Sequence, residues 1–300
     1  MRKAAIVITV LLLVAALALM AASAGLLPLP FLGLGESGTS LSAVNMPFST
    51  SLTEEREYAA ELKPELAVDT PHGEITVQGA DVDQVQIQME IQTKAAAPLR
   101  AQELMREVSL DIQTAEDRIT LQVQAPRLRN NEMARADLTL LVPHRMHVDL
   151  KTGLGDVEVR EIEGYVRVLD QLGTIRLQSF KGDAYLETAL GNIEISASEF
   201  DKELVALSHL GDLTVEASLA GRNVLESSLG DITLILLPEE SYVLEASIDL
   251  GSFRSQVPFK GQQGKDGVKG VIGEGEQRGS IFADLSLGSL ELKNQRDGRD

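Results

Sequence analysis

The sequence predicts an all-β protein, a single-stranded right-handed parallel β-helix with about 18–21 residues per coil and a small strand-plus-helix cap near its N-terminus. Three observations predict it. A Leu-Gly dipeptide returns at nearly even steps along the second half of the chain, and apolar residues alternate with polar ones on both sides of it. A coil of this length is also too short to hold a crossover helix, so equivalent strands must run parallel.

The repeat is clearest at Leu154-Gly155-Asp156-Val157-Glu158-Val159. Glycine has no Cβ, so it fits a corner that needs a positive φ or a close backbone approach. The glycines at this position of the main stack are Gly155, Gly173, Gly191, Gly211, Gly230, Gly251 and Gly288. Gly73 has the same frame upstream, and we expect it to form an N-terminal coil that an inserted layer separates from the main stack.

Each coil is expected to contain two short strands that bury alternate side chains on one axis. The first buried position after the glycine is Val157, Ile175, Ile193, Leu213 or Ile232. A second pair of positions precedes each Leu-Gly, as at Val148 and Leu150, and Asn223 is its polar exception. Equivalent side chains of successive coils should therefore stack into one core.

Residues 57–147 are expected to hold the N-terminal coil and a β/α cap layer. Alternating apolar runs there predict strands, and the spacing of Ala101, Leu104, Met105 and Val108 after Pro98 predicts a helix. Residues 148–293 hold the repeats, which the Gly-, Gln- and Lys-rich segment 256–280 interrupts. We expect that segment to be a mobile surface loop in the place of a missing coil, and residues 294–300 to be a disordered tail.

The N-terminus predicts export. Arg2 and Lys3 precede an apolar run that reaches about Ala22, and Ala22-Ser23-Ala24 fits a signal-peptidase site. Residues 1–24 are therefore a cleaved signal peptide or a retained membrane anchor, and residues 25–56 a flexible linker. The positive flank keeps the start of the chain cytoplasmic, so the remainder is extracytoplasmic in either case and meets the membrane only through this segment.

Composition excludes some function classes. The formal net charge of −18 opposes binding to nucleic acid and to anionic lipid headgroups. The chain has no Cys, so it has neither disulfides nor a thiolate nucleophile. We expect no cofactor.

Several polar patterns could carry chemistry. The residues that follow the glycines, among them Asp156, Asn192, Asp212 and Asp231, form a ladder that could bind a divalent cation, but turn residues that satisfy their own backbone are the favoured interpretation. His144 and His147 point to opposite faces of a strand, which disfavours a metal site. We expect no metal.

An enzyme is disfavoured because no nucleophile elbow, zinc motif or phosphate-binding loop is present. Glu158, Arg176 and Glu194 should stack with alternating sign on an outer face. They indicate a solvated salt-bridge ladder, although some polysaccharide-modifying β-helix enzymes use similar groups. Tyr165 and Tyr185 point outward about one coil apart and are the candidate surface contacts.

The Leu-Gly-Asp frame, the upstream copy His72-Gly73-Glu74-Ile75-Thr76-Val77, the strand–helix–strand insert and the export signal resemble the bacterial putative-adhesin domain family, which is related to the head-GIN putative adhesins. The resemblance covers roughly residues 64 to 293. It implies a β-helix envelope protein of unknown function and brings no catalytic residues. This chain differs in having Leu before the glycine, where Ser or Thr is common.

The sequence therefore predicts a non-catalytic, exported cell-envelope or surface protein that acts as an adhesin-like binding or scaffolding module. Its partner would be an envelope or surface protein or a polysaccharide, and self-association is possible. An envelope stress-sensing or signalling protein is the first alternative, and a polysaccharide-modifying enzyme is the second.

Overall fold

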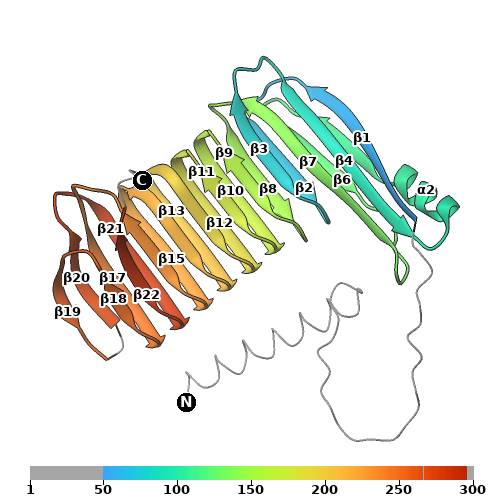
Figure 1. Cartoon of the computed structure of the whole chain (residues 1–300). Helices are drawn as coiled ribbons and strands as arrows, with labels where there is room; N and C mark the ends of the chain where they lie inside the picture. The colour runs from blue at the N-terminus through green and yellow to red at the C-terminus, as the bar shows by residue number, and fades with distance from the viewer. Residues whose placement is uncertain (1–49, 266, 296–300) are drawn as a thin grey trace, which may run out of the picture.

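The computed structural model describes residues 50–265 and 267–295. Apart from helix α2 (Pro98–Glu107) these residues form one mixed 22-stranded sheet. The strands lie side by side along the molecule, with β1, β4 and α2 at one end and β19 and β20 at the other (Figure 1). Their hydrogen bonds define two rows, and β13 contributes to both.

The first row, in spatial order, consists of β5 (Ser109–Thr114), β6 (Arg118–Gln124), β2 (Glu65–Thr70), β8 (His147–Thr152), β10 (Glu163–Leu172), β12 (Lys181–Leu190), β13 (Ile193–Leu210), β15 (Gly221–Leu229), β21 (Glu276–Leu287), β17 (Glu240–Leu250), β20 (Gly267–Gly273) and β19 (Phe259–Gln263).

The second row consists of β1 (Thr50–Ala60), β4 (Val85–Ala95), β7 (Met133–Pro143), β3 (Ile75–Ala80), β9 (Val157–Arg160), β11 (Ile175–Gln178), the start of β13, β14 (Leu213–Leu219), β16 (Ile232–Leu236), β22 (Leu290–Asn294) and β18 (Phe253–Ser255).

The predicted single-stranded right-handed parallel β-helix is wrong, although the fold is all-β. The sheet is mixed, because both ends contain antiparallel pairs: β1–β4, β4–β7, β5–β6, β17–β20 and β19–β20. A strand that follows its neighbour through a short turn must reverse direction, as β6 does after β5. The repeats between these ends pair in parallel.

The spatial order of the repeats also differs from their order in the chain. The Gly73 repeat is not separated from the main stack, since β2 pairs directly with β8 and β3 with β9. At the other end, β21 and β22 lie between β15–β16 and β17–β18. Within the segment expected to be a surface loop, residues 259–263 and 267–273 are strands β19 and β20, and β21 begins at Glu276.

The core lies between the two rows and follows the alternation seen in the sequence. Ile175 pairs with Val157 and Ile193, Ile193 with Leu213, and Leu213 with Ile232, and all five side chains are fully buried. These residues belong to a single hydrophobic cluster that runs through the molecule. The fixed register therefore keeps these inward side chains in contact with the equivalent side chains of the two neighbouring strands.

Asn223 is fully buried among these apolar side chains. Its Nδ2 donates hydrogen bonds to the carbonyl oxygens of Leu219 (3.4 Å), Ala220 (3.3 Å) and Ser280 (3.2 Å). Ser280 lies on β21, so this amide joins the inserted C-terminal repeat to its neighbour.

Helix α2 covers the sheet near β1 and β4. Pro98 stands in its first turn, where the missing N–H is harmless, and Ala101, Leu104 and Met105 are buried. Arg56 on β1 donates to the carbonyl oxygens of Met105 (3.1 Å) and Val108 (2.8 Å) at the end of the helix. The predicted helix is confirmed, and its apolar residues pack against β1 and β4 at this end of the core.

Residues 1–24, the expected leader or anchor, lie outside the described residues. So does the expected linker up to residue 49, while β1 already begins at Thr50. Among residues 50–265 and 267–295, no helix combines the length and apolarity needed to cross a bilayer.

We predict that Leu213→Ala lowers the free energy of unfolding by about 2–5 kcal/mol, because it leaves a cavity in the stacked core. Thr214→Ala, the outward neighbour on β14, should change it by no more than about 0.5 kcal/mol. Urea melts of both variants measure the difference. Equal effects would contradict the inward direction of Leu213.

Candidate interaction surface

The repeat glycines hold the corners at which the chain passes between the rows. At Gly191, φ is 150° and a Cβ would lie 1.8 Å from the carbonyl oxygen of Gly173, so any side chain would collide with the neighbouring repeat. A positive φ also occurs at Gly73, Gly155, Gly211, Gly230 and Gly288. At Gly173 and Gly251 the neighbouring carbonyl blocks a Cβ in the same way. For Gly251 that carbonyl belongs to Gly288, as the inserted β21–β22 repeat requires.

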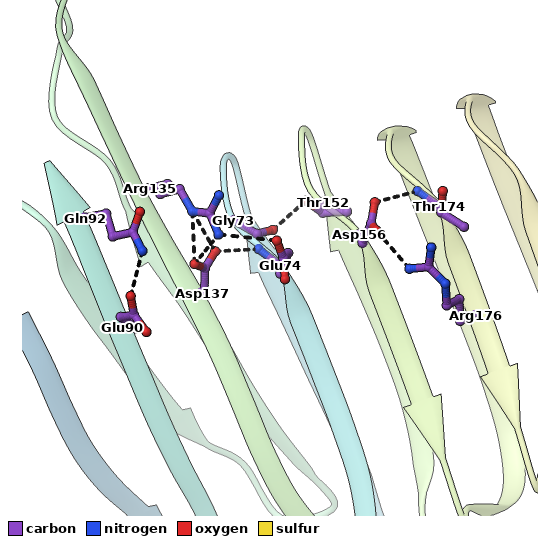
Figure 2. A network of polar contacts seen from close by, with 10 residues as sticks. All are labelled: Gly73, Glu74, Glu90, Gln92, Arg135, Asp137, Thr152, Asp156, Thr174 and Arg176. Carbon is purple, nitrogen blue, oxygen red and sulfur yellow. Dashed lines mark hydrogen bonds and ion pairs between the residues drawn. The ribbon is translucent and has the colours of Figure 1, made fainter. Parts of the chain in front are cut away.

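The Asp or Asn that follows four of the glycines bonds to the neighbouring repeat and not to its own turn. Asp156 Oδ1 accepts a hydrogen bond from the backbone N–H of Thr174 (2.9 Å), Asn192 from Asp212 (2.9 Å), and Asp212 from Asp231 (2.8 Å). Figure 2 shows this contact for Asp156 and the equivalent one between Asp137 and Glu74. Asp and Asn are interchangeable here because only one side-chain oxygen is needed.

Arginines neutralise part of this ladder. Arg176 contacts Asp156 (2.8 Å) and Glu194 (3.2 Å), and Figure 2 shows Arg176 beside Asp156. Glu158 instead pairs with Arg160 of its own strand (2.5 Å). Such exposed pairs contribute about 0–1 kcal/mol each. In the described part of the chain, no group of three or more acidic or His side chains is arranged to hold a metal ion.

The two histidines of the 144–147 segment make separate contacts. His144 Nδ1 lies 3.0 Å from the carbonyl oxygen of Glu161, and His147 Nδ1 accepts the backbone N–H of Tyr165 at 3.0 Å. His144 therefore contacts the turn between β9 and β10, and His147 contacts the backbone of β10.

A second ladder lies inside the corner, where hydroxyl groups donate to glycine carbonyl oxygens. Thr188 bonds to Gly173 (3.3 Å) and Ser208 to Gly191 (3.0 Å). Asp170 occupies the equivalent position and is only 4% exposed. It accepts the backbone N–H of Leu172 (3.0 Å), and burial raises the pKa of its carboxyl group to about 7.

The outer face of the first row carries an apolar column that crosses four adjacent strands. Tyr185, Val205, Val224 and Phe282 occupy one register line on β12, β13, β15 and β21, and each is half-buried. Leu169 on β10 and Leu207 on β13 also face outward, two residues beyond the register line of this column. We call these six residues the apolar face.

Apart from Ile235 on β16, the outer face of the second row is polar at the corresponding strands. Its outward residues from β9 to β22 include Glu158, Arg176, Glu194, Thr214, Thr233 and Glu291. The two faces of the molecule therefore differ in kind, although the same repeat builds both.

Two arginines cover the aromatic members of the apolar face. The guanidinium carbon of Arg167 lies 5.9 Å from the ring centroid of Tyr185, and that of Arg222 lies 5.1 Å from the ring of Phe282. These cation–π contacts hold both rings against the sheet.

Carboxylates border the apolar column on both sides. Asp183 and Glu203 lie on one side, where Arg222 is in register with Glu203, and Glu187, Glu226 and Asp284 lie on the other. Burial, together with repulsion from Asp249, raises the pKa of the Asp284 carboxyl group. We call these five residues the acidic rims.

The leucine that precedes each glycine adds an exposed apolar edge beside this row. Leu190 is 37%, Leu229 42%, Leu287 47% and Leu250 59% exposed. Leu229 pairs with Leu287, and Leu287 with Leu250, so these side chains are neighbours in the sheet.

The structure places Tyr165 and Tyr185 on the same outer face, on adjacent strands. They are two positions apart in register, because Tyr165 lies opposite Asp183 and Tyr185 opposite Arg167. Tyr185 belongs to the apolar face and donates its hydroxyl to Glu187 (2.7 Å), whereas Tyr165 is 42% exposed at the margin.

Sequence reasoning missed the other members of the apolar face and also Asp170. The alternation of inward and outward residues along each strand, which identified the tyrosines, also places Val205, Val224 and Phe282 on the outer face. For Asp170, the signal was an acidic residue at a position that is Thr or Ser in neighbouring repeats.

A buried polar cluster lies at a different corner. Glu240 accepts hydrogen bonds from Ser218 (2.8 Å) and from the hydroxyl of fully buried Tyr242, and Arg278 lies 3.4 Å away. Burial raises the pKa of Tyr242. These contacts join β14, β17 and β21, so the carboxylate acts as a tie between strands.

No protein-family model and no curated protein matches the chain. Solved structures that it is similar to include a putative adhesin from Parabacteroides distasonis (11% identity, TM-score 0.44, covering 80% of this chain and 97% of that one) and a putative adhesin from Bacteroides fragilis (14%, 0.42, 82% and 98%). Another is a putative lipid binding protein from Parabacteroides distasonis (12%, 0.41, 80% and 97%).

We predict that the free energy of unfolding falls as pH rises from about 4 to 7 because of Asp170. Its folded pKa of about 7 lies above the ordinary value of 3.8, so within this window the folded state holds a proton that the unfolded state lacks. Asp170→Thr, which restores the hydroxyl ladder, should reduce this slope and raise stability at pH 8 by about 1 kcal/mol or more.

Urea melts between pH 4 and 8 measure the effect, with Asp201→Asn at an exposed carboxylate as control. An unchanged slope in Asp170→Thr would contradict the buried, proton-binding role of Asp170.

Proposed function

We propose that this chain is an exported, non-catalytic binding module of the cell envelope or surface, which holds its partner on the apolar face of the first row. The observation that carries the proposal is the in-register column Tyr185, Val205, Val224 and Phe282 on an outer sheet face. An adhesive or scaffolding role fits a contact surface of this kind.

The apolar face is unusual because outward positions of a sheet with a solvated side are normally polar. Its side chains are half-buried by one another and by Arg167 and Arg222, yet they still meet solvent. Contiguous apolar surface with a polar rim is typical of a protein interaction site. Covering it would release ordered water and stabilise a complex by about 25 cal/mol for each Å² buried.

The location follows from the N-terminal sequence, whose basic start and apolar run indicate export. The charged residues that a polysaccharide-modifying enzyme would use form ion pairs instead: Glu158 pairs with Arg160, and Glu194 with Arg176. These contacts support binding over the polysaccharide-modifying alternative.

We predict that Val205→Ser/Val224→Ser removes the partner and leaves the fold intact. Each change replaces apolar surface at a half-exposed outward position, where burial against a partner contributes about 0.8 kcal/mol per CH₂. Affinity capture with the full-length chain from solubilised envelope, followed by quantitative mass spectrometry, should show at least about tenfold less partner.

The matched control is Thr214→Ser/Thr233→Ser, which alters outward positions of the second row. It should retain the partner. If both variants capture the same proteins in the same amounts, the apolar face is not the binding surface.

A further inference from the structure

The dimensions of the apolar face match those of an α-helix, and this inference rests on the proposed function. Neighbouring strands are about 4.8 Å apart, so the members of the column recur at about that interval across the sheet. The pitch of an α-helix is about 5.4 Å. A helix lying across the strands would therefore place one apolar side chain per turn close to each of Tyr185, Val205, Val224 and Phe282.

The acidic rims are spaced to contact both flanks of such a helix. Glu203 and Leu207 are four residues apart on β13, and Leu207 lies in register with Glu187 and Glu226, so the two rims are about 13 Å apart. A helix with its side chains is about 10–12 Å wide. Basic side chains on its two flanks would reach the two rims.

Five carboxylates against two arginines, Arg167 and Arg222, make the surface net acidic, which favours a cationic partner. Among the described residues, Glu203, Glu226 and Asp284 form no ion pair, although they border apolar side chains. The whole chain carries a net charge of −18. Like-charge repulsion disfavours a second copy of the chain and an anionic lipid surface in this position.

The ends of the column limit the contact. Arg167 takes the next register position beyond Tyr185, and Glu245, beyond Phe282, is paired with Lys269 at 3.1 Å. The uncharged column between them spans about 14 Å, which corresponds to about three helical turns.

We propose that the apolar face binds a basic amphipathic α-helix of a partner protein. The helix lies across β12, β13, β15 and β21, with its apolar stripe on the column and its Lys or Arg side chains against the acidic rims. Recognition of this type reads apolar anchors at i, i+3, i+4 and i+7, and the flanking charges set its specificity.

The test uses a synthetic amphipathic peptide of about 18 residues, with leucines on one face and lysines on both flanks. The same peptide with glutamates in place of the lysines is its control. Fluorescence anisotropy with the full-length chain should detect binding of the basic peptide only. Glu203→Gln/Glu226→Gln should weaken that binding about tenfold or more, and Val205→Ser/Val224→Ser should abolish it.

The matched control is Glu55→Gln/Glu57→Gln on β1, which changes the net charge equally at exposed positions away from the face. It should bind as the unmodified chain does. Equal binding of the basic peptide to both Gln variants, or equal binding of the acidic peptide, overturns the inference.

The failure of this inference can be distinguished from that of the proposed function. If neither peptide binds while Val205→Ser/Val224→Ser still loses its envelope partner, the face is a binding surface whose ligand is not a basic helix. Binding of anionic phosphatidylglycerol vesicles that is lost in Val205→Ser/Val224→Ser, without peptide binding, would likewise reject the helix.

Discussion

Register between neighbouring repeats is the constraint on which the rest of this structure depends. Because equivalent residues pair strand by strand, every inward position becomes a continuous core column and every outward position a continuous surface column. The corner residues reinforce this register, since Asp156, Asn192 and Asp212 each accept a backbone N–H from the next repeat. The same constraint that buries Ile193 and Leu213 therefore also aligns Val205 with Val224 on the outside.

The alternation of apolar residues predicted the strands of the repeats and their buried positions, and the spacing after Pro98 predicted the helix. Strands β19 and β20 and the start of β1 were not predicted. The alternation could not predict which repeats are neighbours. The repeats that end at Gly251 and Gly288 have equivalent patterns, so either could pair with the repeat of Gly230, and the choice depends on how the intervening β19–β20 hairpin packs. Strand direction at the two ends could not be predicted either, because an alternating run of residues has the same pattern in parallel and antiparallel pairs.

The candidate surface was predicted only in part. Outward parity identified Tyr165 and Tyr185, but Leu204-Val205-Ala206-Leu207 is apolar at both parities, and such a run is typical of a strand buried on both sides. Phe282 joins the column only because β21 is inserted beside β15, which no local pattern shows. Asp170 was not predicted because an isolated acidic residue in a strand is usually exposed. Its inward position becomes recognisable only when it is aligned with the hydroxyl residues of the neighbouring repeats.

The insertion of β21 between β15 and β17 can be measured directly, since the chain has no native Cys. In the structure Glu226 lies opposite Asp284, and Asp284 opposite Ser247. Neighbouring Cα atoms about 4.8 Å apart permit a disulfide, whereas positions two strands apart, at about 9.6 Å, do not. Oxidation followed by thiol counting should therefore show a crosslink in Glu226→Cys/Asp284→Cys and free thiols in Glu226→Cys/Ser247→Cys. The reverse result would show that the repeats stack in chain order, and it would remove Phe282 from the apolar face.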